Sequence, residues 1–264
     1  MPVSPNAIPS SGPVSIGMLN TEFGLGNNLN AYKGLRMYNT ADNSRRDIGT
    51  GANAYVAMSD FRGYQAVTPV VAGSRAYLTT QTDTLPLFNV MTITVWGGGG
   101  GGGGGSIKNA VYGRGEDGNG GSPGGTSSLV KTSPSTNWAN AVGGGGGGGG
   151  QRSGQNATTG ADGSGYDGAY GQFGTGGAAQ NNDGATGGTG GGRGGYGGKT
   201  VVTWNVDSDP SLLARQLQGV TVTVGGGGSK GTGNQVCWPS YPYICQTGTA
   251  GTDGTAGRVN ISWT

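Results

Sequence analysis

The sequence predicts a mainly β protein with polyglycine-II-like helices, preceded by a small mixed N-terminal segment with short helices. Glycine supplies 63 of the 264 residues, and much of it lies in the unbroken runs 97–105, 143–150 and 225–228. A short strand-like segment leads into each run. Only 32% of the chain is hydrophobic, and its large apolar residues cluster in the N-terminal third and in a few short segments. Because a glycine run has no side chains to bury, order in it must come from backbone packing.

The first part of the chain indicates short helices. Residues 1–13 are rich in proline and serine and predict an extended arm. The apolar residues Ile16, Leu19 and Phe23 then recur at spacings of three and four, which predicts a short helix that Gly24 interrupts.

Two segments of this part resemble each other. Residues 29–34 (LNAYKG) and 58–63 (MSDFRG) each contain an apolar residue, two small or polar residues, an aromatic residue, a cation and a glycine. They indicate either a weak internal repeat or two unrelated helix ends, each capped by glycine.

Strand-like segments dominate the remainder. Residues 91–96 (MTITVW) alternate apolar and polar side chains at the period of a half-buried strand. Asp209 and Pro210 are placed to start one short helix, 211–218, that Gly219 would end. We therefore expect an N-terminal attachment or oligomerisation region, 1–87, and a glycine-rich β domain, 88–264. The other expected strands are 66–71, 75–80, 138–142, 200–206, 220–224 and 258–263.

The glycine runs fit two structures. A flexible linker would mix glycine with serine and join two domains once. This chain instead repeats a strand followed by glycine three times, which favours extended helices with three residues per turn that bond to one another. Glycine does not recur at every third position along the whole chain, and proline is only 11 residues, so collagen is excluded. Packing must outweigh the large entropy that glycine loses on ordering.

Composition excludes several classes of function. The formal net charge is +2, which gives no basic footprint for nucleic acid. Histidine, the commonest general base and metal ligand, is absent, so we expect no enzyme, cofactor or metal site. The first residues have no basic region followed by an apolar one, and no apolar stretch approaches the ~20 residues that span a bilayer. We therefore expect neither a secretory signal nor a membrane span.

Residues 88–264 resemble the C-terminal glycine-rich domain of bacteriophage tail-fibre and tail-tip proteins. The likeness is carried by TITVWGGGGGGGGG (92–105), VTVTVGGGG (220–228) and the closing GTDGTAGRVNISWT (251–264). The segment VSIGMLNTEFGLGNNLNAYKG (14–34) is similar to one that recurs in phage virion proteins. The chain departs from the family in 206–218, which is longer and more helical than the usual turn.

This resemblance implies a virion protein at the host-facing end of a tail, made in the host cytoplasm. It implies a non-enzymatic adhesin whose loops, displayed on a polyglycine scaffold, contact a bacterial surface receptor. Residues 1–87 would bind other tail proteins or further copies of the chain, with a trimer preferred. The alternatives are a structural tail component without receptor contact, or a secreted glycine-rich surface or ice-binding protein.

The candidate receptor-binding residues lie in an aromatic loop. Trp238, Tyr241 and Tyr243 sit in the segment VCWPSYPYIC, 236–245, which interrupts glycine-rich sequence. Aromatic side chains provide large contact area at low entropic cost, so this loop is a candidate receptor contact. It is equally a candidate mini-core that plugs the end of the glycine bundle. Cys237 and Cys245 stand at its two ends, either joined by a loop-closing disulfide or reduced.

A second aromatic group is formed by Tyr166, Tyr170 and Phe173, spaced through glycine and alanine. It is a further receptor-contact candidate, with simple edge packing as its alternative. Residues 162–167 (DGSGYD) weakly resemble a calcium-binding nonapeptide, but that motif works in tandem copies and occurs once here.

Overall fold

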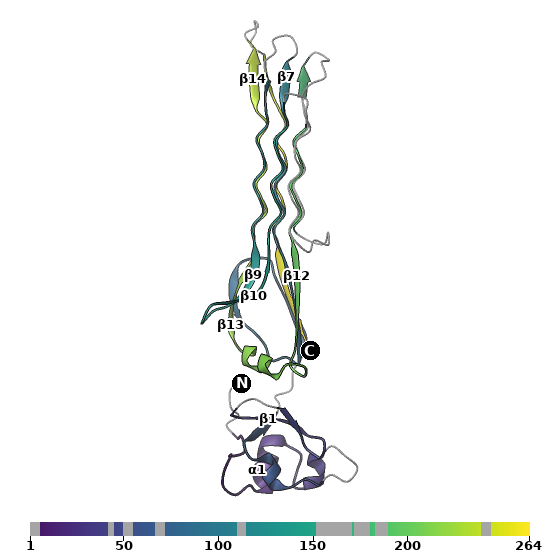
Figure 1. The fold of residues 1–264 in the computed structure, drawn as a ribbon, viewed down its shortest axis with the longest axis vertical. Coiled ribbons are helices and arrows are strands. Elements are labelled where there is room, and N and C mark those ends of the chain that lie inside the picture. The colour runs from purple at the N-terminus through teal and green to yellow at the C-terminus, as the bar shows by residue number, and fades with distance from the viewer. Residues whose placement is uncertain are drawn as a thin grey trace.

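The computed structural model describes residues 6–41, 45–49, 55–66, 72–109, 115–151, 171, 180–182, 190–238 and 244–264. The molecule is elongated, with a small N-terminal unit at one end, a β-sandwich next to it, and a long shaft that rises from the sandwich (Figure 1). Short strands stand at the far end of the shaft. The prediction of a mainly β fold is confirmed.

The N-terminal unit contains the helix that the apolar spacing predicts. Helix α1 spans Ile16–Phe23, and the Ser15 side chain caps its start by accepting from the Met18 N–H. It ends at Gly24, whose φ of 70° is in the left-handed region that favours glycine. The core of this unit consists of Ile8, Leu19, Tyr32, Met37, Ile48 and Phe61, all buried. A three-stranded sheet completes it, in the order β2 (Arg45–Asp47), β1 (Arg36–Asn39), β3 (Tyr64–Ala66).

The two similar segments of this unit adopt the same local structure. Each forms a 3-10 helix, η1 (Leu29–Tyr32) and η2 (Met58–Phe61). Each is followed by a cation in extended conformation and then by a glycine, Gly34 or Gly63, with φ of 75°. The Tyr32 and Phe61 rings pack edge to face with their centroids 5.5 Å apart.

Backbone hydrogen bonds extend this correspondence beyond the segments. The Gly34 N–H donates to the Ile48 carbonyl, and the Ile48 N–H donates to the Leu35 carbonyl. In the same way, the Gly63 N–H donates to the Ile8 carbonyl, and the Ile8 N–H donates to Tyr64. The glycine after each 3-10 helix thus bonds to a buried isoleucine that precedes the other 3-10 helix: Gly34 to Ile48, and Gly63 to Ile8. This shared pattern favours the internal repeat over two unrelated helix ends.

The sandwich consists of two four-stranded sheets in the orders β12-β6-β16-β4 and β10-β9-β13-β5. Along β6, the buried Met91, Ile93 and Val95 alternate with partly exposed threonines, as the sequence pattern predicts. The strands are β4 (Gly73–Tyr77), β5 (Gln81–Thr84), β6 (Val90–Trp96), β9 (Ser127–Lys131), β10 (Thr136–Ala141), β12 (Lys199–Asn205), β13 (Gly219–Thr223) and β16 (Arg258–Trp263).

The sandwich begins earlier in the chain than the expected boundary after residue 87. Strand β4 pairs with β16, and β5 pairs with β13, so both belong to the sandwich. The N-terminal unit contacts the sandwich through Tyr38, which lies in the sandwich core cluster, and through an ion pair of 3.6 Å between Arg36 and Asp207.

The expected helix 211–218 is wrong in type and length. The structure has a 3-10 helix, η3 (Pro210–Arg215), in its place. A right-handed helix could not continue through Leu217, two residues further on, because its φ is positive, 55°. The Gln216 side chain instead donates to the Phe88 carbonyl at 2.6 Å and fastens this segment to the sandwich.

A polar cluster joins the two sheets where β4 faces β5. The Arg75 guanidinium donates to Asp83 at 2.7 Å, and the Tyr77 hydroxyl donates to the same carboxylate oxygen at 2.6 Å. Burial, together with the hydrogen bond to Asp83, raises the pKa of Tyr77 to about 12. Burial alone would raise the pKa of Asp83, but hydrogen bonds from Tyr77, the Thr84 N–H and Arg75 outweigh it and lower that pKa.

The cluster predicts a stability that falls at both extremes of pH. The lowered pKa of Asp83 contributes stability above the pKa of an unfolded aspartate, about 3.9, and loses it as the pH falls. The raised pKa of Tyr77 contributes stability below about pH 10 and loses it as the pH rises toward 12. In melting curves across pH, we expect Tyr77→Phe to reduce the alkaline loss and Asp83→Asn to reduce the acid loss. Unchanged pH profiles would contradict this account.

The shaft is built from six described glycine-rich segments that run side by side. They are residues 97–105, 117–125, 143–151, 190–198, 225–234 and 248–257. Each continues one sandwich strand; for example, β6 runs directly into the central segment, 97–105, and segment 248–257 runs directly into β16. At ~3.1 Å per residue, nine residues span roughly 28 Å.

The central segment bonds to its neighbours with a period of three residues. Gly97, Gly100 and Gly103 donate N–H bonds to segment 190–198. The N–H groups one position later donate to segment 117–125, and those two positions later donate to segment 248–257, with N···O distances of 2.8–2.9 Å throughout. Three residues per turn with bonds only between segments is the geometry expected for packed polyglycine-II helices.

The outer segments form a ring around the central one. Segment 143–151 accepts bonds from 190–198 and from 117–125, while 225–234 accepts bonds from 117–125 and from 248–257. Gly171 lies beside Gly97 and Gly197, and its carbonyl accepts the Gly197 N–H at 2.9 Å. The central segment is buried along its whole length, which explains why it is unbroken glycine.

The ring segments need glycine mainly where they face a neighbour. In segment 248–257, glycine recurs at every third residue, and a Cβ at Gly251 would lie 2.2 Å from the Gly102 carbonyl oxygen. The residues between these glycines, such as Thr252 and Asp253, are exposed. In segment 248–257 the period of three therefore marks the face that turns toward the central segment.

Candidate functional site

The distal end of the shaft carries the described part of the predicted aromatic loop. Strands β14 (Gln235–Trp238) and β15 (Ile244–Thr247) form an antiparallel hairpin in which Cys237 lies directly opposite Cys245. The two cysteines are joined by a disulfide. Hairpin formation brings their Cα atoms to 4.0 Å, so the bond closes the loop that separates the strands.

A second small sheet stands beside this hairpin. It has the order β11 (Gln180–Asn182), β7 (Ile107–Asn109), β8 (Gly115–Glu116), and β7 directly follows the central segment of the shaft. The buried Ile107 packs against Val236 of β14 and forms a small apolar cluster at the end of the shaft. The strands at the distal end are therefore anchored to one another and to the shaft (Figure 1).

Most predicted receptor-binding residues lie outside the described residues: Tyr166, Tyr170, Phe173, Tyr241 and Tyr243. Trp238 is the last residue of β14, directly after the disulfide-bonded Cys237. The expected contact or plug role of the aromatic loop stays a prediction.

The flank of the shaft displays a few polar and aromatic side chains. The Arg193 guanidinium lies 5.9 Å from the centre of the Tyr196 ring on segment 190–198. The Asn119 amide donates to the Thr232 hydroxyl at 2.8 Å, and the Lys230 N–H donates to an Asp253 carboxylate oxygen at 2.7 Å. The last two contacts tie neighbouring segments together, whereas the first lies within one segment.

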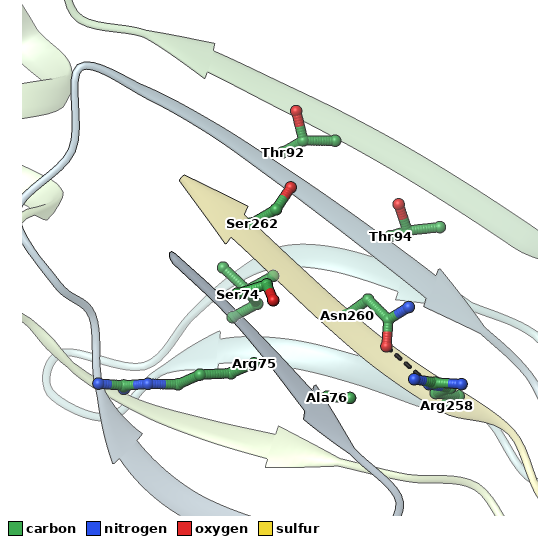
Figure 2. A pocket seen from close by; sticks show the side chains of 9 residues that line it. Ser74, Arg75, Ala76, Thr92, Thr94, Arg258, Asn260 and Ser262 are labelled. Atoms are coloured by element: carbon green, nitrogen blue, oxygen red, sulfur yellow. Dashed lines mark hydrogen bonds between the residues drawn. The ribbon is translucent and has the colours of Figure 1, made fainter. Parts of the chain in front are cut away.

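A polar hollow of about 250 Å³ lies on the outer face of the sheet β12-β6-β16-β4. Figure 2 shows the side chains of Thr92, Thr94, Asn260 and Ser262 side by side on this face, with Arg258 next to Asn260. Arg75 extends away from them, toward the neighbouring strand β5. A second hollow of about 350 Å³ adjoins it and shares Ser74, Thr92 and Ser262.

Sequence reasoning missed this hollow. Its side chains occupy the polar positions of two alternating strands, β6 and β16, which predict only a solvent face. The available signal was that three of these positions, Thr92, Thr94 and Ser262, carry small hydroxylated residues. Pairing places them in a row, because Thr92 lies opposite Ser262 on one side and opposite Thr203 on the other.

Across the described ranges, no group of three or more histidine, cysteine, aspartate or glutamate residues is placed to hold a metal ion. In that same part of the chain, no helix is long and apolar enough to span a bilayer. Comparison of the chain with models of protein families, with curated proteins and with solved structures found no match.

Proposed function

We propose that this chain is a virion protein of a bacteriophage tail fibre or tail tip and acts as a host-receptor-binding adhesin through loops displayed on a polyglycine shaft. The observation that carries the proposal is the bonding pattern of the central segment, whose N–H groups turn to a different neighbour at each residue. A bundle bonded in this way is a stiff spacer with little side-chain chemistry of its own. In this proposal, the shaft holds the distal hairpin and small sheet at a fixed distance from the sandwich and the N-terminal unit.

The two ends of the molecule differ in a way that suits attachment and display. The N-terminal unit has its own apolar core and suits binding to other tail proteins or to further copies of the chain. The distal end carries a disulfide-closed hairpin and an adjacent small sheet. A disulfide between the two strands pre-organises the hairpin, and pre-organisation lowers the entropic cost of binding, which favours receptor contact at that end.

The test is competition for adsorption. We expect the purified chain to block phage adsorption to host cells, and the triple variant Trp238→Ala, Tyr241→Ala, Tyr243→Ala to lose most of this blocking at an unchanged melting temperature. Tyr55→Ala, which removes an exposed aromatic side chain from the N-terminal unit, is the matched control and should block normally. Normal blocking by the triple variant would remove this loop from the contact site. No blocking by the unmodified chain would favour a structural tail component without receptor contact.

A further inference from the structure

We propose that the Cys237–Cys245 disulfide is a redox-controlled conformational device. The oxidised bond holds the distal half of the β14–β15 hairpin closed, and its reduction opens that half while the shaft and the sandwich stay folded. The biological use of the device rests on the proposed function, because it concerns the same distal end. Its structural part is independent of any receptor.

The shaft and one apolar contact hold the near half of the hairpin. The two shaft segments that continue into β14 and β15 are hydrogen-bonded where they meet the hairpin, since the Gly248 N–H donates to the Asn234 carbonyl at 2.9 Å. One residue pair further on, Val236 packs against the buried Ile107 of β7. Both anchors lie on the shaft side of the cysteines.

The cysteine pair lies beyond these anchors, at a position where the strands exchange no backbone hydrogen bonds. Bonded and unbonded pairs alternate along an antiparallel ladder, so the bond between Gly248 and Asn234 makes Cys237–Cys245 an unbonded pair. Their Cα separation of 4.0 Å agrees, because unbonded pairs lie about 4.5 Å apart and bonded pairs about 5.5 Å apart. The disulfide is therefore the cross-link between the strands at this level.

A hairpin of this size depends on such a cross-link. β14 and β15 form a two-stranded sheet with four residues in each strand. A two-stranded hairpin by itself is marginally stable in water, and a disulfide favours the closed form by removing freedom from the open one. Without the bond, we expect the pairs Cys237–Cys245 and Trp238–Ile244 to separate, while Val236 keeps the near half in place.

The bond is accessible to dissolved thiols, because both cysteines are exposed residues. A dithiol such as dithiothreitol attacks one sulfur, breaks the S–S bond through a mixed disulfide and is itself oxidised to a cyclic disulfide. Two electrons and two protons pass to the protein, which is left with two thiols. Cys237 and Cys245 are the two cysteines of the chain, so no other thiol of the same chain can exchange with them.

The proposed function gives this device a use. A tail protein is made in a bacterial cytoplasm, where thiols are kept reduced, and acts outside the cell, where disulfides persist. The distal hairpin would then be open during assembly and closed after release. Receptor contact would be disfavoured inside the producing cell and favoured outside it.

The structural test is amide exchange of the full purified chain by NMR, before and after dithiothreitol treatment without denaturant. Mass measurement after alkylation of a separate sample counts the free thiols. We expect reduction to speed exchange at Cys237, Trp238, Ile244 and Cys245 at least ~10-fold and to leave the shaft glycines 97–105 unchanged. The matched control, Cys237→Ser with Cys245→Ser, should exchange as fast as the reduced chain, with or without dithiothreitol.

The functional test compares adsorption blocking by the oxidised chain, by the chain reduced and desalted under argon, and by the same chain after reoxidation. We expect reduction to weaken blocking at least ~10-fold and reoxidation to restore it. If the double serine variant does not melt cooperatively, the reduced unmodified chain decides.

Three results would overturn the proposal: unchanged exchange at the four hairpin amides, equal acceleration throughout the shaft and the sandwich, or equal blocking by the oxidised and reduced chains. If the oxidised chain itself does not block adsorption, the proposed function fails. The exchange result alone then decides whether the disulfide controls the hairpin.

Discussion

Replacing Gly101 by alanine should open the shaft. A Cβ at this position would lie 2.1 Å from the Ser229 carbonyl oxygen, a contact between backbone atoms that no change of side-chain rotamer can relieve. Segment 225–234 must therefore move away, which breaks the bonds that Gly228 and Gly231 donate to the central segment. Lost bonds and buried polar groups left without partners should together cost about 3–5 kcal/mol of unfolding free energy. Denaturant unfolding and amide exchange of 97–105 measure this loss.

The matched control is Gly226→Ala. This glycine lies in an adjacent segment of the same shaft, but a Cβ there would have no atom within 4 Å, and its φ is not in the left-handed region. Alanine should therefore be tolerated, and should stabilise the chain by about 0.4–1 kcal/mol because the unfolded state loses freedom. Equal effects of the two substitutions would contradict a shaft held together by close backbone approach.

The sequence predicts that the glycine runs pack together, but it does not predict the order in which the segments lie side by side. The continuation of a strand into glycine at Trp96–Gly97 was visible as a repeated pattern, and it led to the packed-backbone interpretation. The order of the segments in the ring was not predictable, because hydrogen bonds between glycines carry no side-chain pattern that selects a partner. In 248–257, glycine at every third residue indicates the face that packs against the central segment. The other glycine-rich segments do not share this spacing, so it does not stand out over the whole chain.

Two other features, the place of strand β4 and the polar hollow, also depend on contacts between segments that are distant in sequence. The sequence predicts a strand at 75–80, which contains most of β4, but does not indicate that it belongs to the sandwich, because its partner β16 lies far away in sequence. The hollow was missed because Thr92 and Ser262 alone are ordinary solvent-facing residues of amphipathic strands. The hollow forms only when the strand register places Thr92 beside Ser262, and this register cannot be seen before the sheet is assembled.

Truncating Ile93 to alanine should weaken the sandwich and the shaft together. Ile93 is fully buried at the middle of β6, between β12 and β16, and the cavity should cost about 2–5 kcal/mol. Because β6 runs into the central glycine segment without a break, that segment is held in place by the strand that Ile93 anchors. Glycine loses much entropy on ordering and gains only modest net hydrogen-bond energy, so the shaft depends on strands that fix its ends.

The expected result is that the amides of Gly98–Gly104 exchange faster in Ile93→Ala, by the same factor as the sandwich amides. The control is Phe61→Ala, which removes a buried ring from the core of the N-terminal unit. It should destabilise that unit by a comparable ~3–5 kcal/mol yet leave exchange in the shaft unchanged. If shaft exchange stayed slow in Ile93→Ala, the glycine bundle would be stable by itself. The strands would then serve to place the shaft, and the backbone bonds between glycines would contribute more net stability than their usual value.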